Sequence, residues 1–446
     1  MTNFLPGMFP AAAVSGGGKI VKAEYIGAVS STANREDNYV FNDVPIGAIS
    51  PDRICVFGVL CVGSGDDLSF SSLTVDGVDA ERVLPNRSRI VDYSNHPLSF
   101  FTIAKPTGTT ANIVVSFPAF EVLPNIIVFV WAVRNASGPF AFSAGATEGN
   151  GTSLQVGLTA PERGALLFVG GHQNTNPATY SSAELVDSHN VENRIYDCAQ
   201  LLSKKENTSF TETRSWSGAA NSAFAGVAFQ PVDTGYPTLA GRALGGTALD
   251  NTPSSFSAPL PPNIQAGDMI VVVVSLQAGA ARAVSTPSGW TKLFSEANGN
   301  VREHCALYRI ATGSEGDSLS LSANGSSRWS THAYRISKHK GRIAGATATG
   351  SSAQPNPPSV SPPWGTGRCL WIVTEADTIN PGNTGSGQLL YPSGYFYGRY
   401  TEQIYLGNIS LKSAAAIRFE RTATLDPPNF TIFSSGAWVA STIAIE

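Results

Sequence analysis

Short runs of β-branched and aromatic residues, bounded by Gly, Pro, Asn and Asp, recur along the chain. Examples are "SLTVDGV" (72–78), "ANIVVSF" (111–117), "NIIVFVWAV" (125–133) and "SLSLSA" (318–323). This pattern is typical of the strands and turns of β-sandwiches and barrels. Helical spacing over three or more turns is nearly absent, and "SAAAIRFER" (413–421) alternates apolar with charged residues toward its end. We therefore predict an all-β protein, with a strand at 413–421.

Two stretches place an aspartate before an unbroken apolar run: "SPDRICVFGVLC" (50–61) and "AGDMIVVVVSLQ" (266–277). Such runs are typical of strands that are buried on both faces. We expect a facing sheet to cover one face of each strand, and loops or a neighbouring subunit to cover the other. Asp52 and Asp268 are expected to be turn or cap residues that bond nearby backbone.

Further similarities between the two halves of the chain follow one another in the same order. The paired stretches are 100–117 with 306–322, 125–139 with 330–341, "AGAT" at 144–147 with 344–347, 158–171 with 360–373, and 222–231 with 436–446. This order predicts two tandem antiparallel β-sandwich domains, jelly-roll-like in strand count and related by internal duplication. We expect an N-terminal docking arm at 1–20, domains at 21–231 and 242–446, and a linker at 232–241 that contains Pro and Gly.

Length, charge and cysteine content limit the classes of protein that need to be considered. The chain has 446 residues, more than the ~250 to 300 at which single cores stop growing, which agrees with two domains. Its net charge of −4 argues against nucleic acid as a partner, and no apolar run approaches the ~18 residues of a membrane span. The five cysteines are odd in number and four lie in apolar runs, so we expect free, buried thiols in a chain made in the cytoplasm.

The sequence contains few signals of catalytic chemistry. It has no G-x-S-x-G turn, no H-E-x-x-H and no C-x-x-C, and "SGGGKI" (15–20) lacks residues that a phosphate-binding loop needs. His304 and Cys305 are the closest pair of metal-ligand types, but consecutive strand residues point to opposite faces. We therefore expect no enzyme activity, no cofactor and no metal site.

The order of strands and turn phrases resembles a known group of proteins. The stretches "AGDMIVVVVSL", "TPSGWTKLF", "ALYRIATGSEGDSLSLS" and "PPSVSPPWGTGRCLWIV" of the second half are similar to β-sandwich domains in minor virion proteins of tailed bacteriophages and prophages. The first half looks like a relative, with "PIGAISPDRICVFGVL" and "SLTVDGVDAERV". The resemblance covers nearly the whole chain after the first twenty residues, and it implies a fibre, spike or decoration module that forms symmetric oligomers.

A tyrosine-rich stretch at 389–405 is one candidate contact surface. Tyrosine offers a large rigid face and a hydroxyl group, which suits both sugar stacking and protein interfaces. Its members are Tyr391, Tyr395, Phe396, Tyr397, Arg399, Tyr400 and Tyr405. The alternative, which we favour, is a segment that packs on its own sandwich or on a sister subunit, because buried aromatic residues are the commoner case.

The densest basic stretch, at 327–342, is a second candidate contact. It contains Arg328, Arg335, Lys338, Lys340 and Arg342, which suit an acidic capsid face or the phosphates of lipopolysaccharide. A solvated strand end and hairpin is the alternative, and isolated charge runs favour it. The N-terminal arm carries Phe4, Met8 and Phe9 among small residues, and we expect these to dock onto a particle.

Together these observations predict a non-enzymatic bacteriophage virion structural protein, a tail fibre, spike or head decoration protein. It is expected to assemble in the host cytoplasm as a homo-oligomer, with a trimer as the first expectation, and to contact other proteins of the head or tail. The low charged fraction of 14% agrees with extensive burial between subunits. A carbohydrate-binding adhesin that recognises a host surface glycan is the alternative, followed by a glycan-degrading tail spike.

Overall fold

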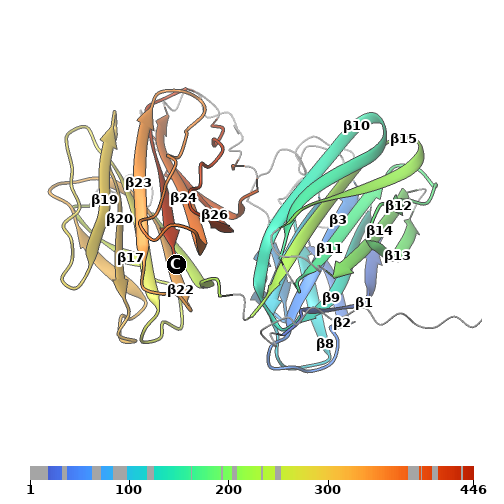
Figure 1. Ribbon diagram of the computed structural model, residues 1–446. Coiled ribbons are helices and arrows are strands. Elements are labelled where there is room, and N and C mark those ends of the chain that lie inside the picture. Colours follow the sequence, from blue (N-terminus) through green and yellow to red (C-terminus); the bar gives the residue numbers. More distant parts are fainter. Residues whose placement is uncertain are drawn as a thin grey trace, which may run out of the picture.

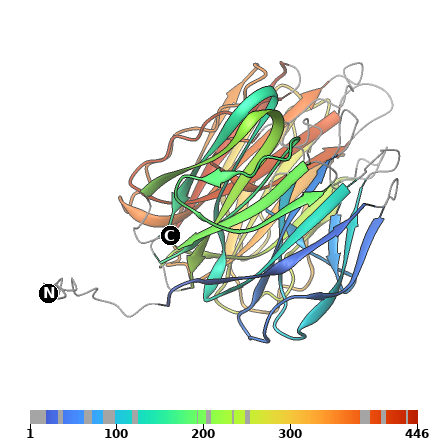
Figure 2. The same ribbon diagram turned by 90° about the vertical axis from the view of Figure 1, so that its right-hand side faces the viewer.

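The computed structural model describes residues 19–32, 38–62, 72–83, 98–117, 125–161, 163–191, 194–202, 208–232, 235–246, 253–379, 391–392, 394–403, 410–432 and 435–446. Within these ranges the chain forms β-strands and connecting turns and no α-helix, as the pattern of apolar runs predicts. The two halves of the chain lie side by side (Figure 1). Viewed along the line that joins them, their strands run in a similar diagonal direction (Figure 2).

The first half is built from three antiparallel sheets. Sheet 1 consists, in spatial order, of β1 (Lys22–Ser31), β9 (Asn125–Arg134), β3 (Ile54–Val62), β7 (Leu98–Ala104) and β6 (Glu81–Arg82). Sheet 2 consists of β2 (Asn38–Pro45), β8 (Thr110–Ser116), β4 (Ser72–Val75) and β5 (Val78–Asp79). Sheet 3 consists of β10 (Ala136–Ala160), β15 (Thr208–Pro231), β11 (Ala165–His172), β14 (Arg194–Leu202) and β13 (Glu184–Val191), with β12 (Thr179–Tyr180) beside β15.

The second half has the same organisation. Sheet 4 consists of β16 (Thr238–Gly246), β22 (Arg328–Ser337), β18 (Met269–Gln277), β20 (Val301–Ile310) and β19 (Thr291–Asn298). Sheet 5 consists of β17 (Ser255–Pro259) and β21 (Ser318–Ser322). Sheet 6 consists of β23 (Ile343–Gly350), β27 (Trp438–Ile445), β24 (Gly367–Ile379), β26 (Ser410–Thr422) and β25 (Phe396–Gln403). Strand β26 contains the stretch 413–421, so the strand prediction made there is confirmed.

Each unbroken apolar run is the middle strand of a sheet that is sandwiched between two others. On β3, Phe57 and Val59 pack with the residues of sheet 2, whereas Val56 and Leu60 belong to the core shared with sheet 3. On β18, alternate residues likewise divide between the core shared with sheet 5 and the core shared with sheet 6. The expectation that loops or a neighbouring subunit cover the second face was wrong, because a third sheet of the same half covers it. A jelly roll has two packed sheets, so each half is more elaborate than that comparison implies.

Glycine sets the approach of two layers at one point of the first half. A Cβ atom added at Gly58, in the middle of β3, would lie 2.5 Å from Cγ1 of Val169 on β11. Since real Cβ atoms do not come so close, the absence of a side chain at position 58 lets sheets 1 and 3 pack tightly here.

Asp52, before β3, accepts hydrogen bonds from the Ser50 hydroxyl (2.5 Å) and the Asn135 amide (2.8 Å), which agrees with its predicted role in the turn.

The matched stretches of sequence occupy matched positions in the two halves. Sheets 1 and 4 have the same order of strands, and so do sheets 3 and 6. The first "AGAT" lies on β10 and the second on β23, each the outermost strand of its sheet. The turns before β11 and β24 are also alike, because the Gly164 amide donates to the Pro161 carbonyl and the Gly365 amide to that of Pro362. Internal duplication stays a prediction, and this correspondence supports it.

The predicted linker at 232–241 is shorter in the structure. Strand β16 begins at Thr238, where its pairing with β22 starts, so residues 238–241 belong to sheet 4. Tyr236 is buried and its ring meets that of Phe419 edge to face at 6.0 Å. An ion pair between Glu81 of β6 and Arg242 of β16 also joins the two halves. These contacts fasten the connection to the second half.

Candidate functional site

A group of buried charged and polar side chains lies on the face of sheet 3 that is turned away from sheet 1. The paired segments 151–160 of β10 and 208–215 of β15, here called the β-ribbon, cover this face. Leu158 of the β-ribbon lies over Gly226, and the ring of Phe210 meets that of Phe168 at 6.2 Å. β10 and β15 form a long curved pair (Figure 1).

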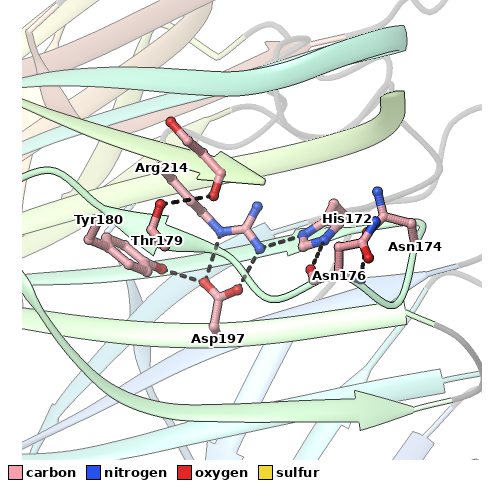
Figure 3. Close-up of polar contacts among 8 residues, drawn as sticks. His172, Asn174, Asn176, Thr179, Tyr180, Asp197 and Arg214 are labelled. Carbon is pink, nitrogen blue, oxygen red and sulfur yellow. Dashed lines mark hydrogen bonds and ion pairs between the residues drawn. The ribbon is translucent and has the colours of Figure 1, made fainter. Parts of the chain in front are cut away.

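Arg214 of the β-ribbon reaches across to Asp197 on β14. Its Nε donates to Oδ1 at 2.8 Å and Nη2 donates to Oδ2 at 2.5 Å, so the ion pair is bidentate (Figure 3). Both side chains are fully buried, and Tyr180 of β12 donates its hydroxyl proton to the same carboxylate. Space for the guanidinium comes from Gly170, where a Cβ atom would lie 2.5 Å from Nε of Arg214. Arg214, Asp197, Tyr180 and His172 form what is called here the Arg214 cluster.

His172, the last residue of β11, completes the Arg214 cluster. Nη2 of Arg214 donates to its Nδ1 at 2.7 Å, so the ring proton is on Nε2, which donates to the Asn176 carbonyl at 2.8 Å. Burial, followed by the charge of Arg214, lowers the pKa of His172 to about 4. The indole of Trp216 stacks on the imidazole at 5.0 Å and also lies under the guanidinium. Both ring nitrogens are therefore occupied, which leaves His172 without a free lone pair for general-base chemistry.

The chain beside the cluster is also held by polar contacts. Asn176 donates from its side chain to the Ser217 carbonyl at 2.7 Å, and Asn174 donates to the carbonyls of Ser217 and Gly218. The carboxylate of Glu212, buried in the β-ribbon, accepts from the Ser181 hydroxyl and from the amides of residues 182 and 183. Nη1 of Arg214 and Nε1 of Trp216 are exceptions, buried donors without a hydrogen-bond partner among the described residues. The arrangement fastens the β-ribbon to sheet 3.

The second half contains a different polar interior, between sheets 4 and 6. The imidazole of His304, on β20, has its Nδ1 2.9 Å from the Ser275 hydroxyl and its Nε2 2.8 Å from the Thr374 hydroxyl. Burial lowers the pKa of His304 to about 3. Nearby, Nε2 of His332 lies 3.0 Å from the Ser413 hydroxyl. The contacts with Thr374 and Ser413 join side chains of the two facing sheets, so here hydrogen bonds accompany the apolar packing that holds the two sheets together.

A pair of carboxyl groups lies on the opposite face of sheet 6. Glu375 and Asp377 are neighbours on one face of β24, and both are buried. Burial, and then the charge of Asp377, raise the pKa of Glu375 well above its usual range, against the effect of Lys412. Neither carboxyl oxygen of Glu375 has a hydrogen-bond partner among the described residues. Because two adjacent buried carboxylates cannot both ionise easily, the raised pKa favours the neutral form of Glu375.

The tyrosine-rich stretch is only partly available as a surface. Tyr395 is 3% exposed and belongs to the core on the outer side of sheet 6, and Tyr391 packs against the same core with its ring 6.1 Å from Phe430. For these two residues the structure agrees with the alternative that we favour, packing on their own sandwich, because they cover the apolar face of sheet 6. Phe396, Tyr397, Arg399 and Tyr400 belong to β25, whose side chains are not described, and Tyr405 lies outside the described residues.

The basic stretch does not form one continuous cationic face. Arg328 and Arg335 lie at opposite parts of β22 and donate to the Gln277 side chain (2.6 Å) and the Ala240 carbonyl (2.7 Å). Lys338 donates to the Val232 carbonyl at 3.0 Å. Lys340 and Arg342 both pair with Glu446, at 2.7 and 2.9 Å. The acid-binding surface stays a prediction, and each of these five side chains has a partner within the chain.

The remaining expectations concern the arm, the thiols, metals and membranes. Phe4, Met8 and Phe9 lie outside the described residues. All five cysteines are buried and none forms a disulfide bond, as predicted. Among the described residues, no cluster of three or more His, Cys, Asp or Glu side chains could hold a metal ion. No helix in the described part of the chain is long and apolar enough to cross a membrane.

Reasoning from the sequence missed the Arg214 cluster. Its members come from four strands that are far apart in the chain, and no motif joins them. One signal was present: Asp197 interrupts the apolar strand "RIYDCAQLL" (194–202), and an acid in such a strand needs a buried partner. Comparison with family models, with curated proteins and with solved structures found no match to this chain.

Proposed function

We propose that this chain is a non-enzymatic structural protein of a bacteriophage virion, a tail fibre, spike or head decoration protein. The observation that carries the proposal is the tandem repetition of one three-sheet arrangement, with the same strand order in sheets 1 and 4 and in sheets 3 and 6. Repeated β-sandwich units joined by a short, anchored connection suit an elongated particle component. The resemblance of the strand and turn phrases to phage virion proteins supports the same class.

The buried polar groups support a structural role over a catalytic one. In the Arg214 cluster both nitrogens of His172 and both oxygens of Asp197 are engaged by neighbours, so the arrangement serves to fasten one layer onto another. His304 is likewise engaged at both ring nitrogens, with Ser275 and Thr374. Side chains used in this way contribute to a rigid, specific packing.

In this proposal the protein acts in the virion, as a homo-oligomer that we take to be a trimer, and contacts other head or tail proteins. The low content of charged residues supports large contacts between subunits. The adhesin alternative is weaker, because the buried Tyr395 and the largely buried Tyr391 cannot stack on a glycan without leaving the core.

Mass spectrometry of density-purified particles tests the proposal. Particles from the organism that encodes the chain are banded, washed in high salt and digested, and the chain is quantified against the major capsid protein. We expect a fixed number of copies per particle that resists the wash. Absence of the chain from washed particles, with the chain present in the unassembled fraction, would contradict the proposal.

A further inference from the structure

An apolar groove lies at one edge of the first half, between sheets 1 and 3. Its volume is about 570 Å³. Residues 20–23, which lead into and begin β1, form one wall, and residues 200–202, which end β14, form the other with Ser182 and Glu184. Most of these side chains are aliphatic, so the groove suits an apolar occupant.

The groove is open because both sheets end here. Strand β1 is the last strand of sheet 1 and β13 is the last strand of sheet 3, so within the described ranges no further strand fills the space between the two sheets at this edge. As a result, Ile20 is 53% exposed and Leu202 is 52% exposed, whereas Val21, which also lines the groove, is buried. Neighbouring exposed aliphatic side chains around a hollow mark a surface that another group covers.

The segment 1–18 of the same chain has the composition of such a cover. It contains Phe4, Leu5, Met8 and Phe9, it has no charged side chain, and it joins the described structure at Lys19, beside the groove. Residues 16–18 are three consecutive glycines, which permit the chain to reverse direction immediately before Ile20. The nine peptide units from Phe9 to Gly18 span up to roughly 30 Å when extended, enough to return along the groove.

We propose that the N-terminal segment folds back at the glycines of 16–18 and places the apolar side chains of residues 4–9 in this groove of its own chain. Attachment to the same molecule favours this occupant over a second copy. A short tether gives an effective concentration in the millimolar range, which exceeds the concentration of free copies. It differs from the expectation that Phe4, Met8 and Phe9 dock onto a particle, because it places these side chains on their own chain. The inference does not depend on the proposed virion function, since it concerns contacts within one chain.

Photo-crosslinking of the full-length protein tests the proposal. Phe9 is replaced by p-benzoylphenylalanine, the purified protein is irradiated, and the crosslinked peptides are identified by mass spectrometry. We expect the crosslink to join position 9 to the groove wall, at residues 20–23 or 200–202. An equimolar mixture of ¹⁴N- and ¹⁵N-labelled protein shows whether the joined peptides come from one molecule, and we expect unmixed isotopes.

Two substitutions of exposed leucines form a matched pair, one inside the groove as the test and one outside it as the control. Leu202→Glu puts a charge into the groove and is expected to lower the crosslink yield by roughly tenfold or more, since a carboxylate buried against apolar groups is strongly disfavoured. Leu185→Glu changes a residue on β13 that is 43% exposed and does not line the groove, and it should leave the yield unchanged. Because both side chains are exposed, neither substitution is expected to unfold the protein.

Three results would overturn the proposal. One is a crosslink to any site outside the groove. Another is a groove crosslink with mixed isotopes, which would assign the groove to a second copy. The third is a yield at the groove that Leu202→Glu and Leu185→Glu affect equally.

Discussion

The guanidinium of Arg214 and the carboxylate of Asp197 form a bidentate ion pair in which both side chains are fully buried. The two residues come from β15 and β14, and the pair holds the β-ribbon against sheet 3. Such a pair is strongly destabilising to break, because the remaining charge stays buried without its partner. The stability of the first half should therefore depend on this contact.

Asp197→Asn removes the negative charge and keeps the shape of the side chain. We expect the free energy of unfolding to fall by about 3 to 5 kcal/mol, as for other broken buried ion pairs. Glu24→Gln is the matched control, since Glu24 pairs with Arg134 at 3.0 Å but its side chain is 52% exposed. Glu24→Gln should lower the free energy of unfolding by no more than about 1 kcal/mol. Urea unfolding followed by tryptophan fluorescence measures both, and equal losses would contradict the account.

Gly170→Ala should act through Arg214. The added Cβ atom would lie 2.5 Å from Cδ and Nε of Arg214, so the guanidinium must move away from Asp197. We expect a loss of about 1 to 3 kcal/mol, the usual range for overpacking. Gly157→Ala in the β-ribbon is the control, because a Cβ atom there meets nothing within 4 Å. Thermal unfolding compares the two variants, and equal stability of Gly170→Ala and Gly157→Ala would contradict this account of the Arg214 cluster.

The stability of the first half should fall in mild acid because of His172. In the folded protein burial lowers its pKa to about 4, from 6.5 when exposed. As the pH falls below about 6.5, protons bind to His172 in the unfolded chain before they bind to it in the folded protein. The free energy of unfolding is therefore unaffected by His172 above about pH 6.5 and falls as the pH approaches 4. Between pH 7 and pH 4.5 this preferential protonation lowers the free energy of unfolding by about 2.5 kcal/mol.

The variant His172→Gln isolates this contribution. Denaturant unfolding at pH 7 and at pH 4.5 gives the change in free energy of unfolding for each protein. The change should be larger in the wild type by about the contribution of His172, since glutamine does not titrate in this range. An identical pH dependence in the two proteins would mean that His172 is not held neutral by burial.

The sequence predicted the strands well and their partners poorly. The apolar runs at 54–62 and 269–277 identified two strands buried on both faces, because period and composition are local properties. What covers them was not predictable, since sheets 3 and 6 form from strands more than 30 residues away in the chain. The shared order of stretches indicated the correspondence of the two halves before any pairing was known.

The role of the tyrosine-rich stretch could not be decided from the sequence for a related reason. Composition showed that Tyr391 and Tyr395 are suited to an interface, but it did not show that these side chains pack on the outer face of sheet 6. The Arg214 cluster was missed because side chains on β11, β12, β14 and β15 meet only after the β-ribbon folds over sheet 3.

Tyr395 separates a core role from a recognition role. Tyr395→Ala should lower the free energy of unfolding by about 3 to 4 kcal/mol, the usual cost of truncating a buried aromatic residue. Tyr395→Phe should be nearly neutral, because the hydroxyl has no hydrogen-bond partner among the described residues. Calorimetry of the three proteins measures this. Loss of glycan or cell binding in Tyr395→Ala without any change in unfolding would favour the adhesin alternative.

Gold-labelled antibody microscopy on purified, intact particles tests the central claim most directly. We predict label on the virion, at a constant place on the head or the tail, and no label on particles from a strain that lacks the coding sequence. Position on the tail tip would indicate a fibre or spike, and position on the head would indicate a decoration protein. Intact particles that carry no label, while the same antibody detects the chain elsewhere in the culture, would contradict the assignment to the virion.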